Sequence, residues 1–172
     1  MKKKIAKFEK ISKWQMFKDV DKLTGYAPNL NDIKDLHDGI KLPQRATKGS
    51  AGYDFYLPHD IIIPPKSSLV IPTFVRCKIK NNYVLMLFPR SGQGFKYGIR
   101  LQNTCGIIDS DYYNSDNEGH IMVKLYNPNN DEFELEKGTA FCQGIFVPFG
   151  VTVDDKVKKN RNGGFGSTDV NK

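Results

Sequence analysis

The residues best suited to chemistry lie almost at the end of the chain, in Arg161-Asn162-Gly163-Gly164-Phe165-Gly166-Ser167-Thr168. Glycines let backbone N–H groups approach an anion closely, and successive N–H groups form a concave nest for phosphate. Arg161 adds a bidentate fork for phosphate oxygens, and Ser167 and Thr168 add hydroxyl donors. Phe165 has no core nearby, so a flat nucleobase is its natural partner. The segment predicts a nucleotide lid, with a flexible Gly/Ser tail as the alternative.

Two segments near predicted strands offer further polar groups. Arg90-Ser91-Gly92 follow the apolar run 83–88 and bring a guanidinium, a hydroxyl and a backbone N–H to one turn, which suits an anion. A plain surface turn is the equal alternative. Asp54 lies among aromatic residues, where a carboxylate is costly unless it is paired or hydrogen-bonded. A structural bond to backbone or to an arginine is at least as well supported as a catalytic role.

A water-activating carboxylate is predicted in Gly106-Ile107-Ile108-Asp109-Ser110-Asp111-Tyr112. Asp109 follows an apolar pair, which should hold it at the edge of the core, where it could act as a general base on water. Tyr112 could wall a sugar, and an acidic turn that only binds water is the weaker alternative. Gln143 lies in the apolar run 139–146 and needs a partner, so hydrogen bonding within the core is slightly favoured over a site role.

Short strands must position these groups. From Ile40 onward, β-branched and aromatic runs alternate with Pro, Gly, Asn and Asp at a spacing of roughly ten residues, which predicts an all-β sandwich or barrel. Residues 80–82 and 127–131 are predicted as tight hairpin turns. The expected strands are residues 53–57, 68–71, 73–79, 83–88, 120–126, 132–135, 139–146 and 150–153.

Residues 1–40 differ from the rest and are predicted as a helical arm packed on the main domain. The first helix is expected to begin after Ser12, its N-cap, and to stop at Gly25. A second helix is expected at 32–38, with Asn31 as its cap. The apolar face of the first helix recurs at every third position: Trp14, Phe17 and Val20.

Composition limits the classes of function. The chain has 172 residues, enough for one domain with a core, and a net charge of +7 that favours anionic partners. Three cysteines without a Cys-x-x-Cys motif favour a reducing, cytoplasmic setting over a disulfide framework or a zinc site. No apolar segment follows the basic N-terminus, so no signal peptide is expected. The longest aliphatic run, 61–63, falls far short of the roughly 20 residues of a membrane span, so no membrane partner is predicted.

Taken in order, the segments around Asp54, Arg90, Asp109 and Gln143 and the C-terminal tail resemble the five motifs of the homotrimeric dUTPase family, over about residues 40–168. The most specific piece is Phe-Pro-Arg-Ser-Gly-Gln-Gly-Phe-Lys-Tyr-Gly-Ile, which continues through Asn103 to Gly-Ile-Ile-Asp-Ser-Asp-Tyr. The resemblance implies an all-β, jelly-roll-like (β-clip) domain that forms a homotrimer with shared active sites. It divides the chain into three parts: the arm 1–40, the β domain 41–155 and a nucleotide-capping tail 156–172.

The resemblance also implies a role for each site residue. Asp109 would be the general base that activates water for attack on the α-phosphorus of dUTP, yielding dUMP and diphosphate. Tyr112 would lie beneath the deoxyribose and exclude a 2′-hydroxyl. Mg²⁺ would bind mainly to the three phosphates, with Asp54 and Gln143 supporting it indirectly through water. The other implied roles are uracil reading by Asn103 and the backbone of Gly106 and Ile108, phosphate binding by Arg90, Ser91 and Gly92, and closure from a neighbouring subunit by Arg161, Phe165, Gly166, Ser167 and Thr168.

This sequence departs from the commonest family pattern in three places. Arg161 lies four residues before Phe165 where five are usual, and Asp169 stands where a glycine is usual. The segment between Tyr112 and Ile121 is longer than in short family members. Its acidic residues are predicted to lie in a surface loop rather than at a contact between subunits.

Three other functions fit parts of the pattern. A deoxycytidine triphosphate deaminase shares the fold, but it needs a glutamate base and a reader of an exocyclic amine, and neither pattern is present. A nucleic-acid-binding β module would suit the basic charge but leaves Asp109 unexplained, so no nucleic-acid partner is predicted. A regulatory protein that uses a dUTPase scaffold and binds a protein partner through residues 1–40 stays open as a second role.

Overall fold

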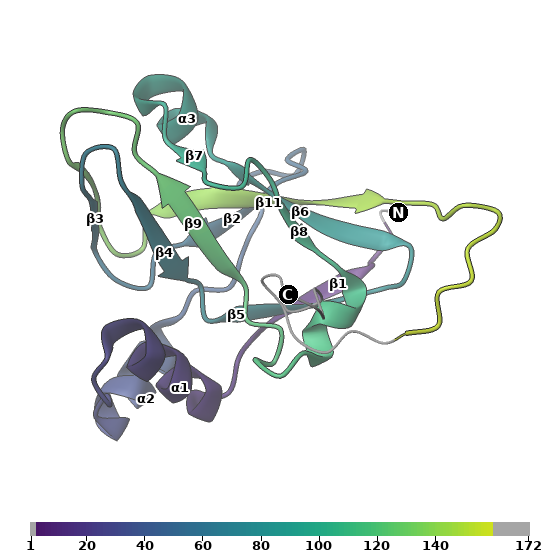
Figure 1. Ribbon diagram of the computed structural model, residues 1–172, viewed down its shortest axis with the longest axis horizontal. Helices are drawn as coiled ribbons and strands as arrows, with labels where there is room; N and C mark the ends of the chain where they lie inside the picture. Colours follow the sequence, from purple (N-terminus) through teal and green to yellow (C-terminus); the bar gives the residue numbers. More distant parts are fainter. Residues whose placement is uncertain (1–2, 160–172) are drawn as a thin grey trace, which may run out of the picture.

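Antiparallel strands dominate the computed structural model, which describes residues 3–159 (Figure 1). The prediction of an all-β fold with helices in the N-terminal arm is confirmed. In chain order the elements are β1 (Ala6–Lys10), α1 (Lys13–Thr24), α2 (Leu30–Gly39), β2 (Tyr53–Tyr56), β3 (Ile61–Ile63), β4 (Ser68–Pro72), β5 (Val75–Ile79), β6 (Tyr83–Pro89), α3 (Ser91–Tyr97), β7 (Arg100–Leu101), β8 (Gly106–Ile108), the 3₁₀ helix η1 (Ser110–Asn114), β9 (Met122–Tyr126), β10 (Phe133–Leu135) and β11 (Ala140–Pro148).

Within the described residues the strands form small sheets that share one core. The largest has the order β2-β11-β6-β8, and a second has the order β4-β9-β7. Two ribbons, β1-β5 and β10-β3, complete the fold. The long strand β11 runs across the molecule in Figure 1, and it pairs antiparallel with both β2 and β6. The β2-β11-β6-β8 sheet therefore carries three of the sequence-predicted motifs on neighbouring strands.

The core is tightly packed where β11 crosses β6. A Cβ atom at Gly144 would lie 2.7 Å from Leu85 Cδ1 and 3.1 Å from the ring of Phe55. Leu85, Leu87 and Phe55 are themselves almost completely buried. A larger residue at position 144 would have to displace these side chains, which well-packed interiors resist. The register of β11 against β6 is thus set by packing as well as by hydrogen bonds.

Both predicted hairpins are wrong as pairings, although both segments reverse the chain. Residues 80–82 contain Asn82 in the left-handed region at φ 70°, yet β5 pairs with β1 and β6 pairs with β11 and β8. Residues 127–131 connect β9 to β10, which also lie in different sheets. The buried Asn127 side chain donates to the carbonyls of Ile63 and Asp131 and holds this crossing. Turn chemistry is local, whereas the choice of strand partner depends on the rest of the fold.

The strands of the structure also differ from the expected ones in number and limits. Residues 150–153, expected as a strand, do not pair: β11 ends at Pro148, which has no backbone N–H for the ladder. The short strands β7 and β8 were not predicted, because two or three residues carry too little periodicity to be recognised. β8 is important for the site described below.

The arm contains a strand as well as its two helices. β1 pairs antiparallel with β5 from Ala6 opposite Ile79 to Lys10 opposite Val75, a pairing that the sequence did not predict. In Figure 1 the helices α1 and α2 lie together on the opposite side of the molecule from α3. The arm is therefore part of the β fold at its beginning rather than an appendage joined by a linker.

The helix limits of the arm were predicted in part. Ser12 caps α1 by accepting a hydrogen bond from the Gln15 N–H, and Gly25 ends it in the left-handed conformation at φ 74°. Both assignments are confirmed. α2 starts earlier than expected, with Asn29 and not Asn31 as its cap. None of the helices in residues 3–159 has both the length and the apolar character needed to cross a bilayer.

The buried face of α1 is not the predicted one. Trp14 is 66% exposed and stacks on Phe17, while the buried residues of the helix are Gln15, Met16 and Asp19. The helix is rotated because Asp19 bonds to the β domain, a polar contact that an apolar periodicity does not register. Phe17 and Val20 pack only at the edge of the core.

Candidate functional site

A cavity of about 290 Å³ lies where β8 meets β6. Gly106 stands opposite Leu87, and a Cβ atom at Gly106 would lie 3.1 Å from Leu87 Cβ, so only glycine allows this approach without displacement. We call this cavity the β8 pocket. Its lining residues are Leu87, Asn103, Cys105, Gly106, Ile107, Ile108, Tyr112 and Met122. The structure thus brings together Asn103, Gly106, Ile108 and Tyr112 from among the predicted site residues.

The turn before β8 places Asn103 at the pocket. Thr104 adopts the left-handed conformation at φ 67°, and the Cys105 N–H donates to the Asn103 carbonyl across 2.7 Å. A β-branched residue in this conformation is strained, and such strain concentrates at functional sites. The turn leaves the Asn103 side chain exposed beside the buried Gly106. The amide of Asn103 and the backbone of β8 therefore meet at the wall of this cavity.

Asp109 follows the pocket-lining Ile108 directly. It is the N-cap residue of η1, with an extended backbone at φ −76° and ψ 160°, and its side chain is partly buried. Its carbonyl accepts a hydrogen bond from the Tyr112 N–H at 3.3 Å. The predicted base and the predicted sugar wall therefore belong to one short turn beside the pocket.

Tyr112 is almost completely buried, at 4% exposure, with its hydroxyl held at two points. The Tyr112 hydroxyl donates to the His120 carbonyl at 2.8 Å and accepts from Asn117 Nδ2 at 2.8 Å. The ring is thus held by the segment that follows it in the chain. Sequence reasoning missed His120 and Asn117; the polar run Asn117-Glu118-Gly119-His120 was the available signal for a tight turn beside Tyr112.

A second group of predicted residues gathers at the C-terminal end of β6. Asp54 on β2 stands opposite Gln143 on β11, and Arg90 Nε lies 3.1 Å from Asp54 Oδ1. Gln143 Nε2 donates to the Pro89 carbonyl at 3.1 Å. We call Asp54, Arg90 and Gln143 the Arg90 cluster. Of the two structural partners expected for Asp54, backbone or an arginine, the structure shows an arginine.

A glycine makes room for the Arg90 cluster. A Cβ atom at Gly52 would lie 2.5 Å from Gln143 Oε1, closer than side chains normally approach. Burial raises the pKa of the neighbouring Cys142 thiol, and the Asp54 carboxylate raises it further. The cluster thus presents a guanidinium, a carboxylate and an amide oxygen over an inert, neutral thiol.

Ser91 and Gly92 form the first turn of α3 and not the surface turn that was the alternative. Arg90 is the N-cap residue, and both following residues are exposed. Gln93 is buried and its Nε2 donates to the Ala140 carbonyl at 2.9 Å, which fixes this glycine-rich helix on β11. Glycines disfavour helix, so only this tertiary contact explains the local structure.

The β8 pocket and the Arg90 cluster are separate within one chain. Ile108 pairs with Leu85, whereas Arg90 follows five residues later beyond the end of β6. At about 3.3 Å per residue, the cluster and the position of Asp109 are on the order of 15 Å apart along the strand. None of the three cluster residues lines the β8 pocket. Within residues 3–159 the predicted phosphate-binding residues Arg90, Ser91 and Gly92 are therefore separated from Asp109.

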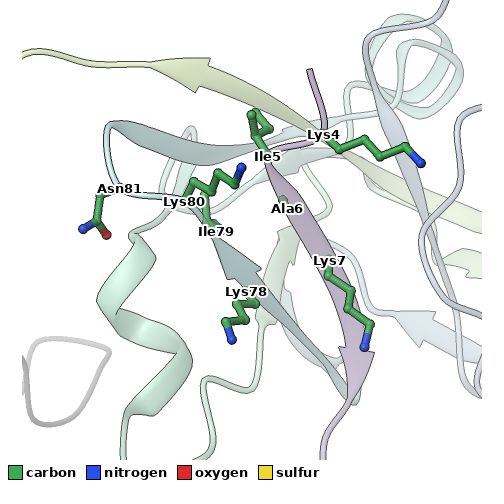
Figure 2. A pocket seen from close by; sticks show the side chains of 8 residues that line it. All are labelled: Lys4, Ile5, Ala6, Lys7, Lys78, Ile79, Lys80 and Asn81. Atoms are coloured by element: carbon green, nitrogen blue, oxygen red, sulfur yellow. The ribbon is translucent and has the colours of Figure 1, made fainter. Parts of the chain in front are cut away.

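A second cavity, of about 450 Å³, lies over the β1-β5 ribbon and is lined by lysines (Figure 2). Lys7 and Lys78 stand directly opposite each other in the ladder. Asn81 at its edge lies 3.5 Å from the Ser110 hydroxyl, beside Asp109. No residue predicted for the site lines this cavity.

The residues described here offer no ready-made metal cage. Among residues 3–159, no three or more His, Cys, Asp or Glu side chains are grouped so as to hold a metal ion. Asp54 and Gln143 do place two oxygen donors across one ladder position. The predicted tail residues Arg161, Phe165, Gly166, Ser167 and Thr168 lie outside the described residues, so their roles stay predictions.

Comparison with known proteins adds independent evidence. A sequence model of the dUTPase family matches residues 38–169. A deoxyuridine 5′-triphosphate nucleotidohydrolase of Lactococcus lactis is 41% identical over 133 residues, covering 76% of this chain and 89% of its own. One from Nautilia profundicola is 37% identical over 141 residues, covering 79% and 96%.

Solved structures of similar proteins agree. The crystal structure of a dUTPase from Streptococcus mutans superposes with a TM-score of 0.63 at 33% identity, covering 84% of this chain and 97% of the other. A dUTPase mutant from phage phi11 of Staphylococcus aureus, described as coordinating a structural Mg(II) ion, has a TM-score of 0.60 at 21% identity, with 72% and 94% coverage. The phage protein supports the fold alone.

Proposed function

This chain belongs to the dUTPase family, and on that premise we propose that it hydrolyses dUTP to dUMP and diphosphate, with Asp109 as the general base. One observation carries the assignment to this residue. Asp109 directly follows β8, whose residues line the pocket together with Tyr112. A nucleoside in that pocket would hold its 5′-phosphates beside one carboxylate.

The β8 pocket would bind the nucleoside. Asn103 offers an amide edge and the backbone of β8 offers peptide groups, the two kinds of partner that can read the polar edge of uracil. The backbone of Gly106 packs closely against Leu87, so this wall of the pocket would disfavour an added methyl group such as that of thymine. Tyr112 would lie against the deoxyribose, with its hydroxyl already engaged.

Asp109 would act on water. The Asp109 carboxylate accepts a proton from the water while the water oxygen forms the new bond to the α-phosphorus. The bond between that phosphorus and the bridging oxygen of diphosphate breaks. Hydrolysis at phosphorus depends mostly on positioning and charge neutralisation, so one well-placed base is sufficient. The negative charge of the leaving diphosphate must be neutralised by the groups that bind the β- and γ-phosphates.

The Arg90 cluster would bind those phosphates. Arg90 provides a bidentate donor, and Ser91 and Gly92 provide a hydroxyl and N–H groups at the start of α3. Mg²⁺, when bound, would neutralise phosphate charge; it keeps much of its water, so Asp54 and Gln143 would hold it through water rather than directly. The absence of a dedicated cage among the described residues fits a metal that arrives with the triphosphate.

The separation of the two groups supports a homotrimer with shared sites. Because the Arg90 cluster and the position of Asp109 lie on the order of 15 Å apart along the strand in one chain, we propose that the cluster of one subunit faces the Asp109 of a neighbour. The tail would close the site from a neighbouring subunit. Cys77, Cys105 and Cys142 are unpaired thiols, which supports a working location in the reducing cytoplasm.

The test begins with diphosphate release from each deoxynucleoside triphosphate, with and without Mg²⁺, and continues with Asp109→Asn. We expect release from dUTP alone. Asp109→Asn should bind dUTP within a few-fold of the unmodified protein and lose turnover by about 100-fold or more. Asp111→Asn, the same change two residues away, is the control and should retain turnover. Equal loss of binding and turnover in Asp109→Asn, or ammonia release from dCTP, would overturn the proposal.

A further inference from the structure

We propose that the N-terminal arm is a positioning element of the nucleotide site, in which Asp19 of α1 acts through His120 to hold Tyr112 against the sugar. The inference rests on the proposed role of Tyr112. It assigns a function within the site to residues 12–19, which the motif pattern of the family did not include.

The first step is the imidazole of His120, which is completely buried. Its Nε2 accepts a hydrogen bond from the Phe74 N–H at 2.8 Å. A backbone N–H can only donate, so Nε2 carries no proton and the ring proton lies on Nδ1. The ring also stacks on Phe74, with centroids 5.3 Å apart and planes at 18°. The orientation and the tautomer of His120 are therefore both set by the β domain.

The second step is the contact with the arm. His120 Nδ1 donates to Asp19 Oδ2 at 2.7 Å, and the other oxygen of Asp19 accepts from Gln15 Nε2 at 3.0 Å. Asp19 is 5% exposed. A buried carboxylate is costly unless both oxygens are satisfied, so α1 can dock in this rotation only with His120 beneath it.

The third step leads from His120 to the pocket. The His120 carbonyl accepts from the Tyr112 hydroxyl at 2.8 Å. The His120 N–H donates to the Asn117 carbonyl, and Asn117 Nδ2 donates to the Tyr112 hydroxyl. A shift of residue 120 would therefore move the acceptor and one donor of Tyr112 together.

A second attachment to the arm lies at Glu118. Its two carboxylate oxygens accept from the Ser12 N–H and hydroxyl at 2.7 and 2.6 Å, and Arg76 Nη1 lies 3.8 Å away. Gly119 has φ 69°, and a Cβ atom there would lie 2.6 Å from the Tyr112 carbonyl oxygen. The segment 112–120 is thus closed tightly on itself and fixed to α1 at Glu118 and His120. Within the chain, Glu118 anchors the arm, a contact that was not predicted.

The attachment of the arm would affect the reaction through the position of the Tyr112 ring. If its ring excludes a 2′-hydroxyl by position, a ring free to shift should discriminate less between dUTP and UTP. Asp109 starts the same turn but lies upstream of the attached segment. Loss of the attachment should therefore affect substrate discrimination and KM more than kcat.

The experiment compares the ratio of kcat/KM for dUTP to that for UTP in a set of full-length variants. Asp19→Ala should lower this ratio by about ten-fold, mainly through KM. Asp19→Asn should restore it, because the amide oxygen still accepts from His120 Nδ1 and the new amide N–H can donate to the unpaired Gln15 Oε1 after that amide turns. Met16→Ala is the matched control: Met16 is a completely buried neighbour on the same helix, and truncating it weakens arm packing but leaves both partners of the Asp19–His120 hydrogen bond in the chain.

The outcomes separate the two proposals. If the unmodified protein does not hydrolyse dUTP, the proposed function fails. If it does, and Asp19→Ala is no less selective than Met16→Ala, the positioning role fails. Tyr112→Phe covers the case in which Asp19→Ala does not fold, since it removes the same connection at the other end. Unchanged selectivity in Tyr112→Phe would also overturn the inference.

Discussion

At the scale of single residues, the most tightly packed position beside the Arg90 cluster is a glycine, Gly52. Gly52 lies so near Gln143 that a Cβ atom would meet its amide oxygen at 2.5 Å. Because Gln143 Nε2 is bonded to the Pro89 carbonyl, the amide could make room only by breaking that bond. Gly52 therefore determines how Gln143, and with it the Arg90 cluster, is presented.

Gly52→Ala tests this arrangement. We expect kcat/KM for dUTP to fall by about ten-fold or more, because the phosphate-binding groups shift. Binding of dUMP, which lacks the β- and γ-phosphates, should stay within about two-fold when measured by calorimetry. Gly49→Ala is the control, since nothing lies within 4 Å of a Cβ atom there. Equal effects of the two substitutions, or equal loss of dUMP binding, would contradict the role given to Gly52.

A third contact joins the arm to the turn beside the pocket, at Glu9 and Tyr113. Tyr113 donates its hydroxyl to Glu9 at 2.5 Å, and its ring lies under the Arg76 guanidinium at 3.5 Å. Glu9 also pairs with Lys7 at 2.7 Å. The hydrogen bonds from Lys7 and then Tyr113 lower the pKa of Glu9.

At the scale of elements, this network predicts how β1 responds to acid. A carboxyl whose pKa is lowered in the folded state stabilises it above the unfolded pKa of about 4.3, and that contribution is lost as the pH falls through the folded value. We expect Glu9→Gln to lower Tm by roughly 1–3 °C at pH 7, because the group is only partly buried. The difference in Tm between the two proteins should shrink when the comparison is repeated in acid, below the lowered pKa of Glu9. A difference that is the same at both pH values would mean that the charge of Glu9 is not involved.

The strand β1 makes the arm part of the β fold. It supplies the strand that pairs with β5 in the described structure, and an edge strand that loses its partner exposes a row of unpaired N–H and C=O groups. The arm was predicted as a cover or a surface for a protein partner. Its contacts through β1, Asp19 and Ser12 give it a role within the chain, whatever else it binds.

At the scale of the whole molecule, the separation of Asp109 from Arg90 predicts complementation between inactive chains. Asp109→Asn and Arg90→Ala should each be almost inactive alone. When equal amounts are unfolded together and reassembled, a shared site pairs one intact Asp109 with one intact Arg90 in about a quarter of cases, as cyclic symmetry requires. We therefore expect about a quarter of the unmodified activity.

The control for this experiment mixes each variant with itself under the same treatment, and sedimentation should give roughly three times the 19.5 kDa chain mass. No recovery of activity from the mixed chains, although trimers form, would mean that each site is made by one chain. An active monomer would have the same meaning.

What the sequence by itself determined was local. Ser12 and Gly25 marked the ends of α1, because a cap bond and a left-handed glycine depend only on neighbouring residues. That Asp54 needs a partner, either backbone or an arginine, followed from the cost of an unpaired carboxylate, and the partner is Arg90. The order of the motifs was sufficient to predict the family, because the residue types that bind phosphate and water can be read directly from the sequence.

What only the tertiary structure decided depends on residues far apart in the chain. The buried face of α1 follows from Asp19 meeting His120, which an apolar period cannot reveal. β5 pairs with β1 and not with β6, although a turn joins β5 to β6. Arg90 follows the last residue of β6, whereas Asp109 follows the residue paired with Leu85 near its beginning, because strand pairing sets distances that cannot be read from spacing along the chain.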